Sequence, residues 1–134
     1  MPDLIDLEVA TPERLIVHEG VADVQLPGKD GYLGILPGHA PLLGLLGTGL
    51  LSYAMAGTRR YVAVHGGFVE VLPDHVRVLA TVAQRAEDVN AEKAAADLRR
   101  SQEQLTNAAT SEEADAALDG MADAQARIEA AEKR

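Results

Sequence analysis

The sequence predicts an α+β protein in which an N-terminal antiparallel β-sandwich precedes a C-terminal antiparallel α-helical hairpin. Two observations lead to this fold class. Residues 1–86 contain several short runs in which apolar and polar side chains alternate, and turns with glycine or proline separate these runs. Beyond residue 86 the spacing of apolar side chains lengthens to the period of an amphipathic helix. We therefore expect a sandwich domain at 1–86 and a two-helix domain at 87–134.

The first of the alternating runs, residues 4–10, shows the strand pattern clearly. Ile5, Leu7 and Val9 fall on one face, and acidic side chains fall on the other. Two glycine-rich segments are expected to interrupt such strands: His65-Gly66-Gly67 should break one strand, and Gly47-Thr48-Gly49 is interpreted as a turn between strands. The same alternation predicts further strands at residues 14–18, 21–26, 50–55, 59–64, 68–72 and 75–82.

A segment of unusual shape, Gly31–Leu43, lies in the middle of the predicted sandwich. It is a short apolar strand that runs into Pro37-Gly38, where proline fixes φ and glycine permits a positive φ. Pro41 disfavours helix at the residue before it, so a second extended stretch should follow. The segment is expected to form a rigid corner that presents His39. Because binding residues often lie on loops that a rigid sheet positions, we interpret this corner as a docking edge.

Two amphipathic helices are expected in the C-terminal domain. Asn90 is suited to cap the first helix, and Thr110 with Glu113 makes a capping box at the start of the second helix. Alanine dominates the predicted contact stripes and buries much less apolar surface than leucine, so the hairpin should be weakly held, as a moving part requires. The two stripes are Ala91, Ala95, Leu98, Gln102 and Leu105, and Ala114, Ala117, Leu118, Met121, Ala124, Ile128 and Ala131.

Composition and charge exclude several classes of function. The chain of 134 residues contains no cysteine, which excludes a disulfide, a thiolate metal site and a cysteine nucleophile. The net charge is −9, with most of the acid excess in the C-terminal third, and this balance disfavours nucleic acid and anionic lipid as partners. No signal peptide is expected. Residues 31–58 carry no charged side chain, but their prolines and glycines argue against a membrane span or direct membrane insertion.

No motif in the sequence predicts catalysis, a metal site or a cofactor. His18, His39, His65 and His75 lie in separate turns or strand ends, without the spacing of metal ligands on one element. Gly28-Lys29 is followed by an acid rather than by the serine or threonine of a phosphate-binding loop. We therefore expect a non-enzymatic protein without a cofactor.

Three segments resemble the epsilon subunit of bacterial F-type ATP synthases: Gly31-Tyr-Leu-Gly-Ile-Leu-Pro-Gly-His-Ala-Pro, Gly66-Gly-Phe-Val-Glu-Val and Val76-Arg-Val-Leu-Ala. The resemblance covers the whole chain. It implies a non-catalytic rotor subunit of the central stalk, peripheral to the cytoplasmic face of the bacterial inner membrane. Such a subunit couples proton flow to ATP synthesis, and its C-terminal helices inhibit ATP hydrolysis. The implied partners are the gamma subunit, the membrane rotor ring and, when the helices extend, the catalytic alpha/beta head.

The resemblance also suggests which residues of the corner contact these partners. Tyr32, His39 and Leu43 are the largest protruding candidates and are expected to meet the gamma subunit and the rotor ring. Many relatives carry an acidic residue where this chain has Tyr32, so an apolar contact is expected there instead of a salt bridge. The alternative for His39 is that its imidazole only braces the turn.

The basic residues of the hairpin are the candidates for contact with acidic surfaces of the catalytic head: Arg99, Arg100, Arg127 and Arg134. The alternative is pairing within a helix, for example Glu103 with Arg99 or Arg100 at helical spacing. A second class of function also stays open. In it, the chain is a free-standing adaptor whose helical hairpin captures an unrelated helix.

Some members of the family bind ATP on the folded hairpin, through an Ile/Leu-Asp-x-x-Arg-Ala pattern at the start of the first helix. In the aligned residues 89–94, Asn90 replaces the acid and Lys93 replaces the arginine. Lysine offers a point charge where arginine offers a planar fork to phosphate oxygens. No nucleotide site is therefore expected, and Arg100 and Arg127 join Asn90 and Lys93 only as weak candidates.

Overall fold

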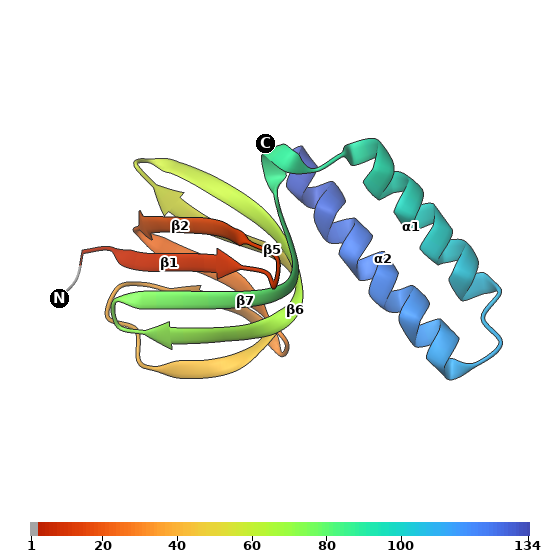
Figure 1. Ribbon diagram of the computed structural model, residues 1–134, viewed down its shortest axis with the longest axis horizontal. Coiled ribbons are helices and arrows are strands. Elements are labelled where there is room, and N and C mark those ends of the chain that lie inside the picture. Colours follow the sequence, from red (N-terminus) through yellow and green to blue (C-terminus); the bar gives the residue numbers. More distant parts are fainter. Residues whose placement is uncertain (1–2) are drawn as a thin grey trace.

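The computed structural model describes residues 3–134 and divides into a layered β-sheet structure and a pair of helices (Figure 1). The predicted β-sandwich followed by a helical hairpin is confirmed. The elements in chain order are β1 (Ile5–Ala10), β2 (Leu15–Val21), β3 (Asp23–Gly28), β4 (Gly31–Ile35), β5 (Leu42–Met55), β6 (Thr58–Leu72), β7 (His75–Arg85), the 3-10 helix η1 (Ala86–Asp88), α1 (Ala91–Thr106) and α2 (Ser111–Glu132).

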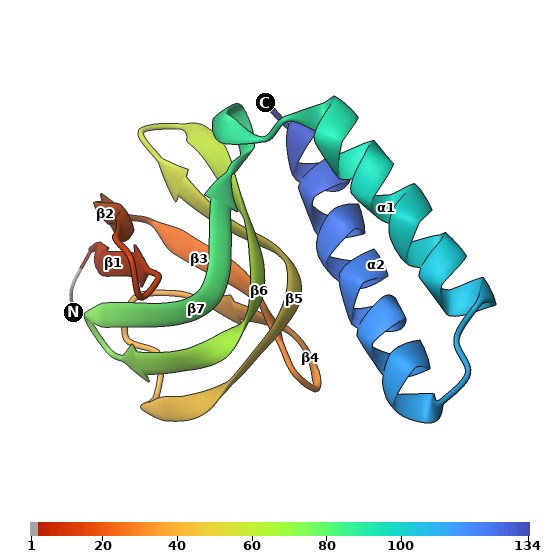
Figure 2. The ribbon, with the colours of Figure 1, turned by 45° about the vertical axis from the view of Figure 1, so that its right-hand side comes forward.

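The seven strands form one hydrogen-bonded sheet in the order β2-β1-β7-β6-β5-β3-β4. Neighbouring strands are antiparallel except for β1 and β7, which pair in parallel. The long strands β5, β6 and β7 bend, and β7 turns most visibly in Figure 2. Because of this bending, the two ends of a single sheet fold over one another and enclose the core as a sandwich does.

Two of the predicted strand breaks are wrong. β5 continues through Gly47-Thr48-Gly49, and β6 continues through His65-Gly66-Gly67. The ladder between β5 and β6 pairs Leu46 with Gly67 and then Thr48 with His65, so its register is unchanged on the two sides of Gly47 and Gly66. Gly66 and Gly67 have φ angles of 67° and 123°, which glycine tolerates. The glycines therefore bend continuous strands instead of ending them.

The bend also shifts the alternation of inward and outward side chains. In β6, Val62 and Val64 enter the core before the bend, and Val69 and Val71 enter it afterwards. The step from Val64 to Val69 is odd, whereas a regular strand repeats every two residues. The register of β6 with β5 and with β7 is the same on both sides of the glycines, so the broken alternation marks a bend that the neighbouring strands share. The buried core of the sandwich comprises Ile5, Leu7, Val9, Ile16, Val17, Val21, Val24, Leu26, Ile35, Leu46, Leu51, Tyr53, Val62, Val64, Val69, Val71, Val76, Val78 and Ala80.

Both predicted helix caps are confirmed. The side chain of Asn90 accepts a hydrogen bond from the backbone N–H of Lys93 at 3.0 Å. Thr110 accepts from the N–H of Glu113 at 3.1 Å, and the Glu113 carboxylate accepts from the N–H of Ala109 at 2.9 Å. These caps satisfy backbone donors that the first turn of a helix leaves free.

The predicted contact stripes of the hairpin are only partly right. On α1 the buried residues are Ala94 and Ser101, whereas Ala91 and Gln102 are exposed. The difference arises because α1 packs mainly against α2, so its buried side chains are the ones that face α2. On α2 Leu118 is exposed, and the buried residues, Ala117, Ala124, Ala126 and Ala130, are spread around the helix. Their spread follows from the position of α2, which has α1 on one side and the sheet on the other.

A second, smaller apolar cluster joins the hairpin to the outer face of β5 and β6. It contains Ala63, Ala86, Val89, Ala94, Ala126 and Ala130 as buried members, with Leu50, Tyr61, Ile128 and Ala131 packed against them. Most of these side chains are small, so each contributes little burial compared with the valines and leucines of the sandwich core. The sandwich therefore has a core of its own that needs no residue of the hairpin.

A chain ending at residue 86 is expected to remain a folded sandwich. The main core cluster draws no member from residues 87–134, and truncation exposes only a few side chains of the smaller cluster. Denaturant unfolding followed by circular dichroism should give one cooperative transition, and an amide NMR spectrum should show dispersed resonances. An unfolded or aggregated truncated chain would show that the hairpin belongs to the core.

Candidate functional site

A row of exposed apolar side chains crosses the outer face of the sheet beyond the bend. Register pairs Leu45 of β5 with Phe68 of β6, and Phe68 with Leu79 of β7. Phe68 is 57% exposed, and Leu43, one outward position further along β5, is 76% exposed. We call these four residues, Leu43, Leu45, Phe68 and Leu79, the docking face. A contiguous exposed group of large apolar residues is typical of a site of protein interaction.

Polar side chains border the docking face. Glu70 and Arg77 pair across β6 and β7, and together with Leu43, Phe68 and Leu79 they line a shallow hollow of about 180 Å³. Arg77 also donates to Glu8 on β1, with 3.4 Å between Nε and Oε2. An apolar centre with a charged border has the composition of a protein–protein interface.

The structure places the three predicted corner residues in different settings. Tyr32 and Leu43 line one hollow of about 410 Å³ between β4 and β5, and Leu43 also belongs to the docking face. The Tyr32 hydroxyl accepts a hydrogen bond from the N–H of Leu50 at 3.1 Å, while its ring stays largely exposed. His39 lies outside this hollow, and its Nδ1–H donates to the carbonyl of Ala40 at 2.7 Å. This contact supports the bracing alternative for His39.

Phe68, Leu45 and Leu79 are not among the site residues predicted from the sequence. A usable signal existed for Phe68, because in Phe68-Val69-Glu70-Val71 the buried valines alternate with Phe68 and Glu70 on the outer face. That Leu45 and Leu79 lie beside it follows only from the strand register.

A polar contact between His65 and Asp119 joins the hairpin to the sheet besides the apolar cluster. His65 of β6 lies at the bend, and its Nε2–H donates to Asp119 of α2 at 3.0 Å. On its other side, Nδ1 of His65 lies 2.8 Å from the Thr48 hydroxyl of β5. Thr48 thereby holds the imidazole in the orientation that reaches Asp119. Local sequence patterns do not indicate this contact, because the two partners are 54 residues apart.

Two basic side chains at the C-terminal end of the chain also contact neighbouring elements. Arg134 donates to the carbonyl of Val89 at 2.7 Å, and the Lys133 ammonium lies 5.6 Å from the centre of the Tyr61 ring. These contacts fasten the residues after α2 to β6 and to Val89, which follows η1. The hairpin is thus held by small apolar side chains and a few polar contacts, which agrees with the prediction of a weakly held element.

Asp97 of α1 forms ion pairs with two of the predicted regulatory arginines. Arg127 of α2 donates to Asp97 at 3.0 Å and to Asp123 at 3.4 Å, and Arg100 lies 3.1 Å from Asp97. The hydrogen bond from Arg127 holds the pKa of Asp97 below its ordinary value of 3.8. Pairing within a helix was the alternative to contact with the catalytic head. Arg100 with Asp97 and Arg127 with Asp123 are pairs of that kind, whereas Arg127 with Asp97 joins the two helices.

The other two regulatory candidates differ from Arg100 and Arg127. Arg134 contacts a backbone carbonyl, as described above, and Arg99 is exposed without an ion pair among residues 3–134. Glu103, offered as a partner for Arg99 or Arg100, pairs with neither, because Asp97 lies closer to Arg100. The prediction that Glu103 is the acidic partner of these arginines is therefore wrong.

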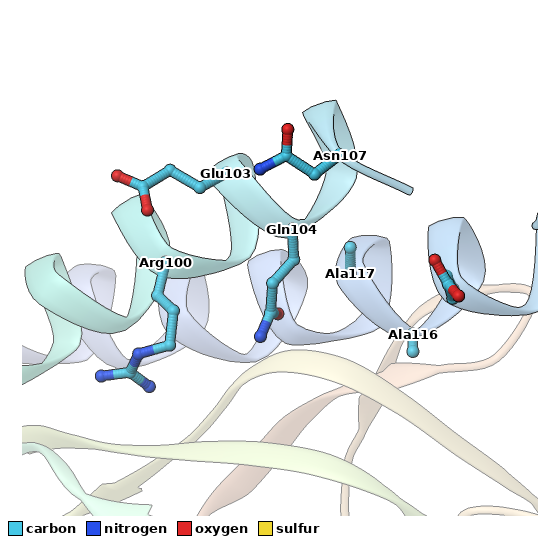
Figure 3. A pocket seen from close by; sticks show the side chains of 7 residues that line it. Arg100, Glu103, Gln104, Asn107, Ala116 and Ala117 are labelled. Carbon is cyan, nitrogen blue, oxygen red and sulfur yellow. The ribbon is translucent and has the colours of Figure 1, made fainter. Parts of the chain in front are cut away.

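A hollow of about 490 Å³ lies between α1 and α2 near the turn of the hairpin. Figure 3 shows the side chains that line it, with Arg100 and Gln104 extending from the same side of α1. Its charged side chains are one arginine and two glutamates, Glu103 and Glu113. A triphosphate would meet more negative than positive charge there.

Comparison with known proteins identifies the family of this chain. The sequence model of the family described as ATP synthase, Delta/Epsilon chain, beta-sandwich domain matches residues 4–86. The ATP synthase epsilon chain of Solibacter usitatus is 54% identical over 134 residues, which is 100% of both chains. This chain belongs to the ATP synthase epsilon chain family. The epsilon chain of Syntrophobacter fumaroxidans is 38% identical over 99% of both chains. Epsilon chains are non-catalytic subunits of ATP synthases, so the family relation excludes catalysis as the role of the chain.

Solved structures share the fold. A chain in the cryo-EM structure of the Euglena gracilis mitochondrial ATP synthase, OSCP/F1/c-ring in rotational state 1, superposes with a TM-score of 0.83 at 22% identity. The match covers 98% of this chain and 82% of the other. A chain of the Tetrahymena thermophila mitochondrial ATP synthase central stalk/c-ring gives a TM-score of 0.63. Within residues 3–134, neither helix is long and apolar enough to cross a membrane.

Proposed function

We propose that the chain is a rotor subunit of the central stalk that docks through its sandwich on the gamma subunit and on the membrane rotor ring. The docking face is the observation that carries this proposal, because it exposes four large apolar side chains to water. Burial of these side chains against a partner protein is favourable. Rotation of the docked subunit with the ring then couples proton flow to ATP synthesis. This position places the chain at the cytoplasmic face of the bacterial inner membrane as a peripheral subunit.

The corner residues extend the proposed contact. Leu43 continues the docking face toward β4, and Tyr32 presents an exposed ring beside it. Both offer apolar contact to the gamma subunit or the ring, and His39 contributes by keeping the corner in shape. Membership of the epsilon chain family removes the support for a free-standing adaptor.

We further propose that the hairpin regulates the enzyme by leaving the sandwich. In the folded state α2 lies on β5 and β6, and the pairs around Asp97 hold α1 to α2. In the extended state the arginines exchange these partners for acidic surfaces of the catalytic alpha/beta head and inhibit ATP hydrolysis. The small contact between hairpin and sheet keeps the two states close in free energy.

Substitution of Phe68 by glutamate is expected to weaken binding to the gamma subunit of the same ATP synthase by more than about tenfold. A carboxylate at the centre of an apolar interface loses its hydration without gaining a partner. A loss of about 1.4 kcal/mol in binding free energy already raises the Kd tenfold. Surface plasmon resonance with immobilised gamma subunit measures the change.

Leu118→Glu is the matched control for this experiment, because Leu118 is also a large exposed apolar residue but lies on the hairpin. It should leave binding unchanged, and circular dichroism should show that both variants keep the fold. Equal weakening by the two substitutions, or no weakening by Phe68→Glu, would contradict docking through this face.

ATP is expected to bind this chain poorly or not at all. The Asn90 side chain is occupied as a helix cap, and Arg100 and Arg127 share their charges with Asp97. Calorimetric titration of the isolated chain with ATP at low salt should therefore show no saturable heat in the micromolar range. The double variant Asn90→Asp with Lys93→Arg should strengthen any residual binding. Saturable micromolar binding by the unaltered chain would overturn this expectation.

A further inference from the structure

A cluster of potential metal ligands lies on the outer face of the sheet at its β2 edge. Asp6 and Glu8 point to the same side of β1 because they are two residues apart. On β2, His18 pairs with Glu8, and on β7, His75 and Arg77 pair with Asp6 and Glu8. Three neighbouring strands thus contribute to one cluster, which shares only Arg77 and its contact to Glu8 with the border of the docking face.

The distances within this cluster are close to those around a single metal ion. Nε2 of His18 lies 3.1 Å from Oδ1 of Asp6 and 3.9 Å from Oε1 of Glu8. Zinc holds nitrogen and oxygen ligands at about 2.0–2.2 Å, so two ligand atoms of a tetrahedral ion stand roughly 3.3–3.5 Å apart. One nitrogen and two carboxylates therefore converge at nearly the required spacing, and one position remains for water.

The second oxygen of each carboxylate has a partner of its own. Nδ1 of His75 lies 3.3 Å from Oδ2 of Asp6, and Nε of Arg77 donates to Oε2 of Glu8 at 3.4 Å. These contacts turn the remaining oxygens, Oδ1 and Oε1, toward His18. Outer partners orient the carboxylates of metal sites in the same way. This arrangement distinguishes the cluster from a chance gathering of acidic residues.

We propose that Asp6, Glu8 and His18 bind a divalent transition-metal ion of the zinc class. A neutral imidazole beside carboxylates suits Zn²⁺, whereas Mg²⁺ prefers oxygen ligands and retains its water. The bound ion ties β2 to β1, and β1 is the only strand that pairs with β2 in the described part of the chain. The spacing of histidines along the sequence does not reveal this site, because it forms across strands.

The test titrates the untagged full-length chain with ZnCl2 in a calorimeter and follows its thermal unfolding. One ion per chain should bind saturably, and the midpoint of unfolding should rise by several degrees. His18→Gln and Asp6→Asn should each weaken the binding by at least about tenfold and remove the thermal shift. His39→Gln alters a histidine outside the cluster and should change neither result, and MgCl2 should give no shift.

Three outcomes would overturn the proposal. The first is the absence of saturable zinc binding by the unaltered chain. The second is equal affinity in the unaltered chain and in His18→Gln, which would show adventitious binding elsewhere. The third is a thermal shift of the same size with MgCl2, which would indicate a general effect of cations on acidic side chains. Circular dichroism at each step verifies that the variants are folded, since all three ligands lie on the surface or near it.

Discussion

Substitution of Gly67 by alanine is expected to destabilise the sandwich by about 3–5 kcal/mol, a large part of the stability of a typical domain. Two effects combine at this position. The φ angle of 123° is strained for any residue with a Cβ atom. A Cβ at Gly67 would also lie 2.0 Å from the backbone carbonyl oxygen of Leu79, so β6 and β7 would have to separate.

Two other glycines provide graded controls for this substitution. Gly57 has a φ of 80° but nothing near its Cβ position, so Gly57→Ala should cost only the backbone strain of about 1–2 kcal/mol. Gly34 has neither a positive φ nor a close neighbour, so Gly34→Ala should change the stability little. Urea unfolding of the three variants measures the series. A Gly67→Ala variant no less stable than Gly57→Ala would show that the bend tolerates a side chain.

Removal of residues 87–134 is expected to raise ATP hydrolysis by the assembled enzyme several-fold, because the inhibitory extended state is then lost. Loosening the folded state should act in the opposite direction. Asp119→Asn weakens the contact with His65, which as an exposed pair contributes about 0.2–1 kcal/mol. The extended state should then gain up to about fivefold in population, and hydrolysis should fall.

Asp115→Asn is the control for Asp119→Asn, because Asp115 is an exposed acid on α2 without an ion pair in the described chain. It should leave the rate unchanged. Crosslinking of the C-terminal helix to the gamma subunit during turnover should increase in Asp119→Asn alone. Unchanged hydrolysis after deletion of the hairpin would show that the hairpin does not inhibit this enzyme. A rise in hydrolysis with Asp119→Asn would show that the folded hairpin is the inhibitory state.

The sequence by itself determined the fold class and the first residues of both helices. Periods of two and of 3.6 residues depend on the geometry of a single element, so they are visible without knowledge of its neighbours. The caps at Asn90 and Thr110 are also local, since each joins residues three apart. Three short segments sufficed to indicate the family, which the match of the family model to residues 4–86 confirms.

Only the tertiary structure decided how the strands bend and what their outer faces carry. Glycine can end a strand or bend it, and the contacts across β5, β6 and β7 select the bend. The bend at Gly66 and Gly67 changes which side chains of β6 face inward, so the partners of Phe68 follow only from the register.

The remaining contacts that carry the proposals share this non-local origin. His65 meets Asp119, Arg127 meets Asp97, and His18 meets Asp6 across different elements. Register between strands and the docking of a helix on a sheet are set by packing of the whole core. A side chain's partner on another element therefore depends on every bulge and turn between them, and the pattern around the residue does not contain that information.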